Sequence, residues 1–283
     1  MADIRKVRRR IRGVTNIAKI TKAMEMIAAS KMRQAQLRVL AARPYSEKMR
    51  EVLGNLAAQP RTDDDSHPLL QHREIKRITV IHITADRGLC GGLNANMNRR
   101  TASFILEQSV PVNLITVGRK GRDFMSRYDR DIRAEFTQLG DKPSLVDTTP
   151  ISRVVIDDYT NKLTDEIYLA YTEFITTVLQ RPVLWKLLPI EPTKFERAQN
   201  IEYIYEPSAS IVLNELLPRY LEMQVYHAIL ESIASEQSIR MVAMRNATDN
   251  ANEMIEDLTL IYNKARQELI TEELLDIAGG IVN

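Results

Sequence analysis

The sequence predicts an α/β domain combined with a long antiparallel coiled coil that is formed by the two ends of the chain. Three observations support this fold class. Apolar residues recur in alternating steps of three and four at both ends, strand and helix patterns alternate in the middle, and the two ends carry opposite charge. Together they predict a globular middle from which two long, paired helices emerge.

The N-terminal segment has the narrow apolar seam of a coiled-coil helix. Of the twelve positions reached from Ile4 in alternating steps of three and four, ten are apolar, and the exceptions are Thr21 and Glu25. No proline occurs before Pro44. A repeat of about 3.5 residues is typical of a left-handed coiled coil. Residues 1–58 are therefore predicted to form the N-terminal coiled-coil helix.

The C-terminal segment has a longer seam of the same kind. From Leu216 to Leu269, thirteen of the sixteen seam positions are apolar. We predict a C-terminal coiled-coil helix over residues 207–283, longer than the first helix and projecting beyond it. The polar positions of this second seam are His227, Gln237 and Thr248. The polar residues of both seams have two open interpretations: they set the register of the pair, or they belong to a surface for another protein.

The net charge of +2 hides a strong asymmetry along the chain. Residues 1–50 contain 14 Lys or Arg and 3 Asp or Glu (+11), whereas residues 211–283 contain 5 and 12 (−7). Either the basic end meets an external polyanion, or the two ends lie against each other and partly neutralise. The matching periodicities favour pairing, and the pair is antiparallel if both helices leave one shared domain.

The middle of the chain predicts a Rossmann-like α/β domain with a largely parallel sheet over residues 76–206, after a linker over 59–75. The linker contains an acidic stretch, 62–66, that we expect to be disordered. The predicted strands are 77–85, Val110–Val117, Pro182–Ile190 and Ile201–Tyr205. The predicted helices are one that ends near Glu107, a short one after Gly118 and a longer one over Pro150–Leu179.

Motifs of catalysis or cofactor binding are absent. The cluster from Gly88 to Gly92 lies between a strand and a helix, where phosphate-binding loops occur, but it has neither the Walker lysine nor GxGxxG spacing. We therefore predict a tight turn there. Cys90, the sole cysteine, has no recognisable base partner and is expected to be buried, and His67 and His72 lack zinc-site spacing. The sequence predicts no catalytic residue, no bound cofactor and no metal.

The segments without charge are too short for a membrane span, since the longest have eleven residues and a spanning helix needs about 20. The basic N-terminal helix could bind nucleic acid through phosphates. Its arginines are not interleaved with aromatic residues, however, and an acidic helix of matching period exists in the same chain. The residues therefore favour a rod-plus-globule interaction protein, with a basic-helix nucleic-acid-binding coiled-coil protein and an enzyme as alternatives.

Three segments resemble, in the same order, the gamma subunit family of F-type ATP synthases. They are ITKAMEMIAASKMR at 20–33, TADRGLCGGLNANMN at 84–98, and ASEQSIRMVAMRNATDNAN at 234–252, which continues into the segment 262–281. The likeness covers both ends and the middle of the chain. One departure is Gly280 followed by Ile281, where the family usually has Gly-Ala and then a small or basic residue.

The resemblance implies a central rotor shaft that performs no bond chemistry. Such a shaft couples proton-driven rotation of the membrane c-ring to ATP synthesis on a hexamer of α and β subunits, and it regulates ATPase activity and proton flow. The implied partners are the α and β subunits, the ε subunit and the c-ring, with one copy of the chain per complex and no nucleic acid. The implied location is peripheral, on the cytoplasmic face of the bacterial cell membrane. ATP, ADP, phosphate and Mg²⁺ would bind the α and β subunits and not this chain.

The family motifs also imply coupling residues. Met24 falls where the shaft faces a β-subunit loop, and Arg240 corresponds to a residue of the same coupling region. The positions that match contacts to the β-subunit catch region are Arg266, Gln267, Thr271 and Glu273. Periodicity alone indicates something plainer: Met24 flanks the seam, and Arg266 and Glu273 lie on a solvated helix face.

Overall fold

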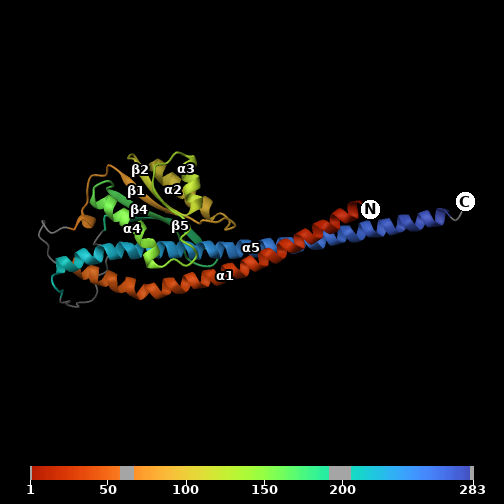
Figure 1. The fold of residues 1–283 in the computed structure, drawn as a ribbon, viewed down its shortest axis with the longest axis horizontal. Helices are drawn as coiled ribbons and strands as arrows, with labels where there is room; N and C mark the ends of the chain where they lie inside the picture. The colour runs from red at the N-terminus through yellow and green to blue at the C-terminus, as the bar shows by residue number, and fades with distance from the viewer. Residues whose placement is uncertain (1, 58–66, 191–204, 281–283) are drawn as a thin grey trace. The chain divides into compact units, whose positions relative to one another are not determined.

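The computed structural model describes residues 2–57, 67–190 and 205–280, so the predicted acidic stretch and almost all of the predicted strand at Ile201–Tyr205 lie outside it. The helices are α1 (Ala2–Ala57), the 3₁₀ turn η2 (Pro68–Leu70), α2 (Leu93–Glu107), α3 (Arg119–Arg127), α4 (Leu145–Thr160) and α5 (Ala209–Gly280). The strands are β1 (Ile78–Ile83), β2 (Val112–Val117), β3 (Ile132–Phe136), β4 (Glu166–Phe174) and β5 (Gln180–Leu188) (Figure 1).

The chain forms two compact units, and the division falls inside both long helices rather than at their ends. Unit 1 consists of residues 1–29 and 240–283, and unit 2 consists of residues 30–239. Unit 2 therefore holds the sheet, its covering helices, the second half of α1 and the first part of α5. Unit 1 holds the remaining parts of α1 and α5.

The sheet of unit 2 has the strand order β3-β2-β1-β4-β5. β1 pairs in parallel with both β2 and β4, β2 pairs in parallel with β3, and only β5 is antiparallel, at the edge. All six residues of β1 are buried, as expected for a central parallel strand that is covered on both faces. The predicted largely parallel sheet is confirmed.

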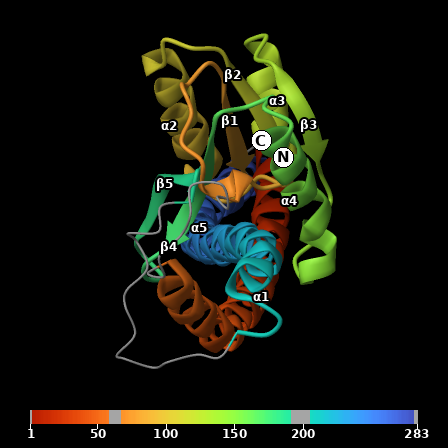
Figure 2. The same ribbon diagram turned by 90° about the vertical axis from the view of Figure 1, so that its left-hand side faces the viewer.

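The two faces of the sheet are covered by different helices (Figure 2). On one face Ile78 and Val80 of β1 pack with Met97 of α2 and Met125 of α3. Successive side chains of a strand point to opposite faces of the sheet. On the second face, Ile81 and the other buried strand residues of its cluster pack against α4, α5 and α1. Unit 2 is thus a three-layer α/β fold in which part of α5 serves as a core helix.

The predicted helix over Pro150–Leu179 is wrong in its second half. α4 begins earlier, where the Asp147 carboxylate accepts hydrogen bonds from the backbone N–H and hydroxyl of Ser144. It ends at Thr160, and Lys162 then adopts a left-handed conformation (φ 59°). Strand β4 follows, because its alternating apolar side chains are buried between β1 and β5. β3 was not predicted at all.

A buried histidine on β1 is fully satisfied in its neutral form. The amide oxygen of Asn98 accepts a hydrogen bond from His82 Nε2 (2.8 Å), so Nδ1 is free to accept one from the Thr101 hydroxyl (3.0 Å). Burial lowers the pKa of His82 to about 4. Gly121 of α3 makes room for the ring, because a Cβ there would lie 2.6 Å from His82 Cδ2. His82 is therefore a core residue that joins β1 to α2.

The pKa of a glutamate on α5 is raised, whereas that of His82 is lowered. Burial first, and then the charge of Glu173 on β4, raise the pKa of Glu231 to about 7. Arg181 is paired with Glu173 (2.8 Å), and His227 Nδ1 lies 3.3 Å from Glu231 Oε1. The second oxygen of Glu231 is buried and has no hydrogen-bond partner among the described residues, although the Phe174 N–H donates to the carboxylate. The carboxyl in the folded protein therefore changes from protonated to ionised as the pH rises through about 7.

This environment predicts that Glu231→Gln stabilises the protein at alkaline pH. A carboxyl whose folded pKa is raised contributes most stability below its unfolded pKa, and loses that contribution as the pH rises through about 7. The glutamine should therefore gain up to about 3 kcal/mol over wild type at pH 8 and much less at pH 5. Urea unfolding of the full chain at both pH values measures this difference.

Two variants control that experiment. Glu107→Gln, on an exposed carboxylate at the end of α2, should show no such pH-dependent gain. Repeating the comparison in a His227→Gln background removes the titration of the neighbouring imidazole. An equal gain from Glu231→Gln at both pH values would contradict the assignment.

Candidate functional site

Unit 1 is an antiparallel pair of helices with a seam of small and medium apolar residues. Val14 and Ala18 of α1 and Ala251 and Leu258 of α5 are buried in it. Residue numbers rise along one helix as they fall along the other, because Thr21 bonds Thr248 and Glu25 bonds Arg245. The predicted antiparallel coiled coil is confirmed for these parts of α1 and α5.

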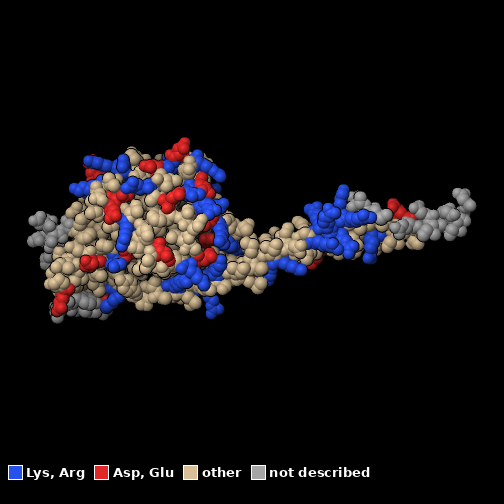
Figure 3. Space-filling view, viewed as in Figure 1, with Lys and Arg blue, Asp and Glu red and all other residues tan. Residues whose placement is uncertain are grey.

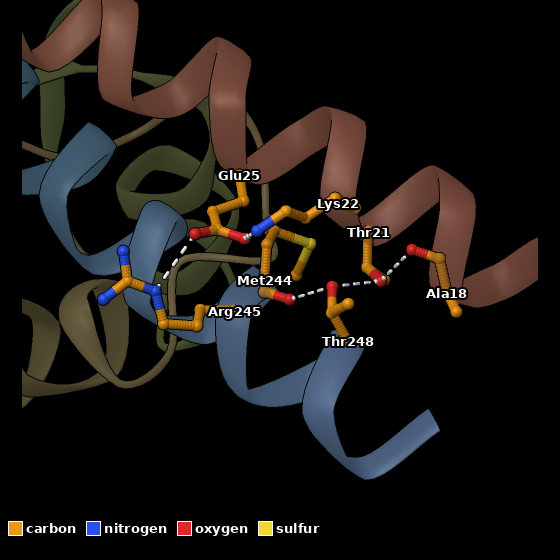
Figure 4. A network of polar contacts seen from close by, with 7 residues as sticks. All are labelled: Ala18, Thr21, Lys22, Glu25, Met244, Arg245 and Thr248. Atoms are coloured by element: carbon orange, nitrogen blue, oxygen red, sulfur yellow. Dashed lines mark hydrogen bonds and ion pairs between the residues drawn. The ribbon is translucent and has the colours of Figure 1, made fainter. Parts of the chain in front are cut away.

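A polar layer crosses this seam (Figure 4). The hydroxyl oxygens of Thr21 and Thr248 lie 2.7 Å apart, and each also lies near a carbonyl of its own helix, Ala18 or Met244. Each hydroxyl has one hydrogen, so one threonine donates across the seam and the other donates to its own helix. Both side chains are buried, and the layer is therefore satisfied entirely from within the pair.

Glu25 lies one turn further along α1 and completes this network. Its carboxylate accepts hydrogen bonds from Lys22 Nζ on its own helix and from Arg245 Nε on α5, each at 3.0 Å. Lys22 and then Arg245 hold the pKa of Glu25 below its ordinary value. Glu25 is 6% exposed, so the side chain stays ionised within the seam because two cations face it. The network ties one turn of α1 to one turn of α5.

In this ion pair between the helices, each helix contributes a charge opposite in sign to the net charge of its segment. Glu25 belongs to the basic helix and Arg245 to the acidic one. Figure 3 shows many Lys and Arg side chains on the surface of the N-terminal part of α1. Four exposed arginines there form no ion pair with the described residues: Arg8, Arg9, Arg10 and Arg12. Mutual neutralisation is thus incomplete, and a basic surface remains.

The residues implied by the family motifs fall into two separate groups. Met24 is half-buried next to Glu25, and Arg240 is 8% exposed. Arg266, Gln267 and Thr271 are exposed, and the Thr271 hydroxyl donates to the Gln267 carbonyl. The side chain of Glu273 lies outside the described part of the structure. Because 26 residues separate Arg240 from Arg266 (266 − 240), the groups lie about 39 Å apart along α5 and do not form one site.

The polar seam residues of both units have partners within the chain. Thr21, Thr248 and Glu25 form the network above, Gln237 donates to Asp141 (3.2 Å), and His227 lies beside Glu231. This supports the interpretation that they set the register. The sequence did not predict Arg245 or Asp141 as their partners, although Lys22 and Glu25 show the three-residue spacing of a helical ion pair.

The carboxyl edge of the sheet, where α/β folds usually bind nucleotides, is closed by α5. The cavity at this edge has a volume of about 50 Å³ and is lined in part by Ile229, Ser232 and Glu236 of α5. Ligand pockets usually measure about 300–1,000 Å³, so this cavity is far too small for a nucleotide. The glycine cluster forms a turn in which Gly91 adopts a positive φ (54°), as a tight turn requires.

Other sites are missing from the described residues. These residues contain no group of three or more side chains that could hold a metal ion. Cys90 is buried, as predicted, and its thiol forms no disulfide. His67 accepts a hydrogen bond from the Leu69 N–H and so caps η2, while His72 is exposed. No described helix combines the length and the apolar character that crossing a membrane requires.

Known proteins match this chain over almost its whole length. A family model described as ATP synthase matches residues 3–282. The ATP synthase gamma chain of Dehalococcoides mccartyi is 62% identical over 280 residues, which cover 99% of this chain and 98% of the relative. The chain belongs to the ATP synthase gamma chain family. This membership confirms the resemblance and makes the chain a non-catalytic central-stalk subunit of a rotary ATP synthase, and nucleic-acid binding finds no support.

Solved structures support the fold of this gamma chain. It resembles a chain of the central stalk and c-ring structure of Tetrahymena thermophila mitochondrial ATP synthase, with a TM-score of 0.63 and 27% identity over 81% of this chain and 99% of that one. A chain of Euglena gracilis mitochondrial ATP synthase matches with a TM-score of 0.72 and 22% identity, over 99% and 94% of the two chains. The second likeness shows the fold alone.

The threonine layer predicts energetic coupling across the seam of the gamma chain. Thr21→Val removes the hydrogen bond across the seam and leaves the Thr248 hydroxyl bonded only to a carbonyl of its own helix. We expect the free energy of unfolding to fall by about 1 kcal/mol. The double variant Thr21→Val/Thr248→Val replaces both hydroxyls by methyl groups and should cost less than the sum of the single changes. A double-mutant cycle from urea unfolding measures the coupling. Strict additivity would show that the two hydroxyls do not interact.

Proposed function

We propose that this gamma chain rotates as the central stalk of an ATP synthase, driven by a ring of c subunits, and that its rotation drives ATP synthesis on surrounding α and β subunits. The observation that carries the proposal is the antiparallel helix pair of unit 1. Its seam is narrow and satisfied from within, so most of the surface of both helices stays available for changing contacts. Two packed helices also resist bending and twisting better than one.

The exposed part of α5 supports a surrounding partner. Beyond the last buried seam residue, Leu258, α5 carries exposed large apolar side chains. They are Leu260, Ile261, Ile270, Leu274 and Leu275. A row of exposed apolar residues on a single helix is typical of a surface that another protein covers. We assign α and β subunits to this surface, with Arg266, Gln267, Thr271 and Glu273 as contacts of a β subunit.

The basic surface of α1 gives the stalk a second kind of contact. Arg8 and its exposed neighbours attract carboxylates, and exposed ion pairs are worth only about 0–1 kcal/mol each. Weak contacts suit a rotating shaft, because a strong contact in one orientation would hold it there. Met24 and Arg240 are assigned to the coupling region that faces a β subunit. The ε subunit and the c-ring are assigned as partners of the α/β domain, in a complex that holds one gamma chain.

The chemistry of the complex is assigned to other subunits. The gamma chain itself binds no nucleotide, phosphate or Mg²⁺ in this proposal, and the closed carboxyl edge of its sheet agrees with that division. Its place is peripheral, on the cytoplasmic face of a bacterial membrane, where it is held through the c-ring.

Native purification tests the proposed assembly. The chain, tagged in its own cell and extracted from membranes under mild conditions, should co-purify with α and β subunits in threefold excess over it. Mass spectrometry of the eluate identifies the subunits and their ratio. If neither α nor β subunits were recovered, the proposal would be abandoned. Retention on DNA at low salt would then favour nucleic-acid binding.

The assignment of Met24 predicts an effect on coupling. Met24→Lys places an ammonium group beside the seam, where it would attract any carboxylate of the facing β subunit and so favour one orientation of the stalk over the others. ATP synthesis should fall relative to ATP hydrolysis while assembly stays intact. Both rates, measured in membrane vesicles, test this, and Met24→Leu is the matched apolar control. An unchanged ratio would remove Met24 from the coupling residues.

A further inference from the structure

Three consecutive residues of α5 are each held by a different loop of the α/β domain. Gln237 contacts the loop between β3 and α4, Ser238 contacts the β4–β5 connection, and Ile239 contacts the glycine turn after β1. Neighbouring residues of an α-helix point about 100° apart, so three in a row face about 200° of its circumference. All of these contacts lie within unit 2, and Arg240, the next residue, is the first of α5 in unit 1.

The first contact joins both long helices to one carboxylate. Asp141 Oδ1 accepts a hydrogen bond from Gln237 Nε2 (3.2 Å), while Oδ2 accepts one from Lys31 Nζ of α1 (2.6 Å). Gly140, directly before it, has a φ of 76°, so the loop turns sharply where Asp141 reaches the helices. Asp141 therefore fixes α1 and α5 to the same loop.

The second contact is part of a ladder of serines. The Ser238 hydroxyl donates to the Thr177 carbonyl (2.7 Å). One turn earlier, the Ser235 hydroxyl donates to the Thr172 carbonyl (3.2 Å), and Ser232 Oγ accepts from the Thr172 N–H (3.3 Å). The pairing of β4 with β1 ends at Ala170, so Ser232 and Ser235 bond the backbone of β4 where β1 no longer does.

The third contact explains the glycine turn that resembled a phosphate-binding loop. A Cβ at Gly91 would lie 3.1 Å from Ile239 Cγ2, so the missing side chain allows the turn to approach the helix closely. Cys90 and Leu93 pack with Ile239 in the same small cluster. The turn is therefore a packing surface for α5.

We infer that these contacts form a collar through which torque passes between α5 and the α/β domain. The collar is made of Ser235, Gln237, Ser238 and Ile239 of α5, Lys31 of α1, and Gly91, Asp141, Thr172 and Thr177 of the domain. The inference rests on the proposed rotation of the stalk. Core packing also resists rotation of α5, but a hydrogen bond depends on direction and fails within about 1 Å of displacement. Side chains lie about 5–6 Å from the helix axis, so a rotation of about 10° moves their tips by about 1 Å. The hydrogen bonds of Gln237 and of the serines therefore add a steep angular restraint to the packing of the core.

Angular fluctuations of the α/β domain test this role in the assembled complex. The α and β subunits are fixed to a surface, rotation is stalled with nucleotide, and a bead is attached through a cysteine introduced at the exposed Arg100, since the native Cys90 is buried. The variance of the bead angle measures the torsional compliance between the fixed subunits and the domain. Ser235→Ala/Ser238→Ala should raise this variance about twofold, because two of the polar restraints are lost.

Matched variants separate torque transfer from simple loss of stability. Ser152→Ala removes the same atom from α4, where the buried hydroxyl has no partner among the described residues, and should leave the variance unchanged. Asp141→Lys should raise the variance, and Lys31→Asp/Asp141→Lys should restore it by reversing the pair. If Ser238→Ala and Asp141→Lys both assemble and keep the wild-type variance, the collar does not carry torque. Failure of the wild-type chain to assemble or rotate would instead contradict the proposed function.

Discussion

The whole structure depends on one constraint: α5 has to be a core helix along one part of its length and a coiled-coil helix along another. Leu217, Leu221, Val225 and Ile229 are buried against the sheet and α4, so the α/β fold of unit 2 is incomplete without them. Beyond Ile239 only a narrow seam of α5 is buried, and its partner is α1. An element shared in this way cannot rotate independently of the domain that it helps to build.

The long helices and the sheet type could be predicted because their signals extend over many residues. The 3.5-residue repeat from Ile4 onwards and the continuous apolar run of β1 leave few alternatives. β4 could not be found in this way, because only a short loop separates it from α4 and its apolar side chains fit either period. β3 is short and has alternating half-buried and exposed residues, and its pairing with β2, rather than its own sequence, makes it a strand.

The candidate site was predicted unevenly for a similar physical reason. The polar seam positions were visible from the repeat, but their partners were not, since Asp141 reaches Gln237 across 96 positions of the chain. The glycine cluster was correctly predicted to be a turn, whereas its contact with Ile239 depends on tertiary packing. Arg266 makes no side-chain hydrogen bond or ion pair with the described residues, so a surface role for it is visible only through the family motif.

The polar layer of unit 1 also acts against wrong alignments of the two helices. A shift of α5 by seven residues would keep apolar residues in most seam positions, so the repeat alone would tolerate it. The same shift would place Thr21 opposite Met241 or Ile255, and Glu25 opposite Ser238 or Asn252. The buried carboxylate of Glu25 would then lose its ion pair with Arg245. The hydrogen bond between the hydroxyls of Thr21 and Thr248 would also be lost. Alignment errors are thereby penalised at one position, and the remaining seam is free to consist of small, interchangeable side chains.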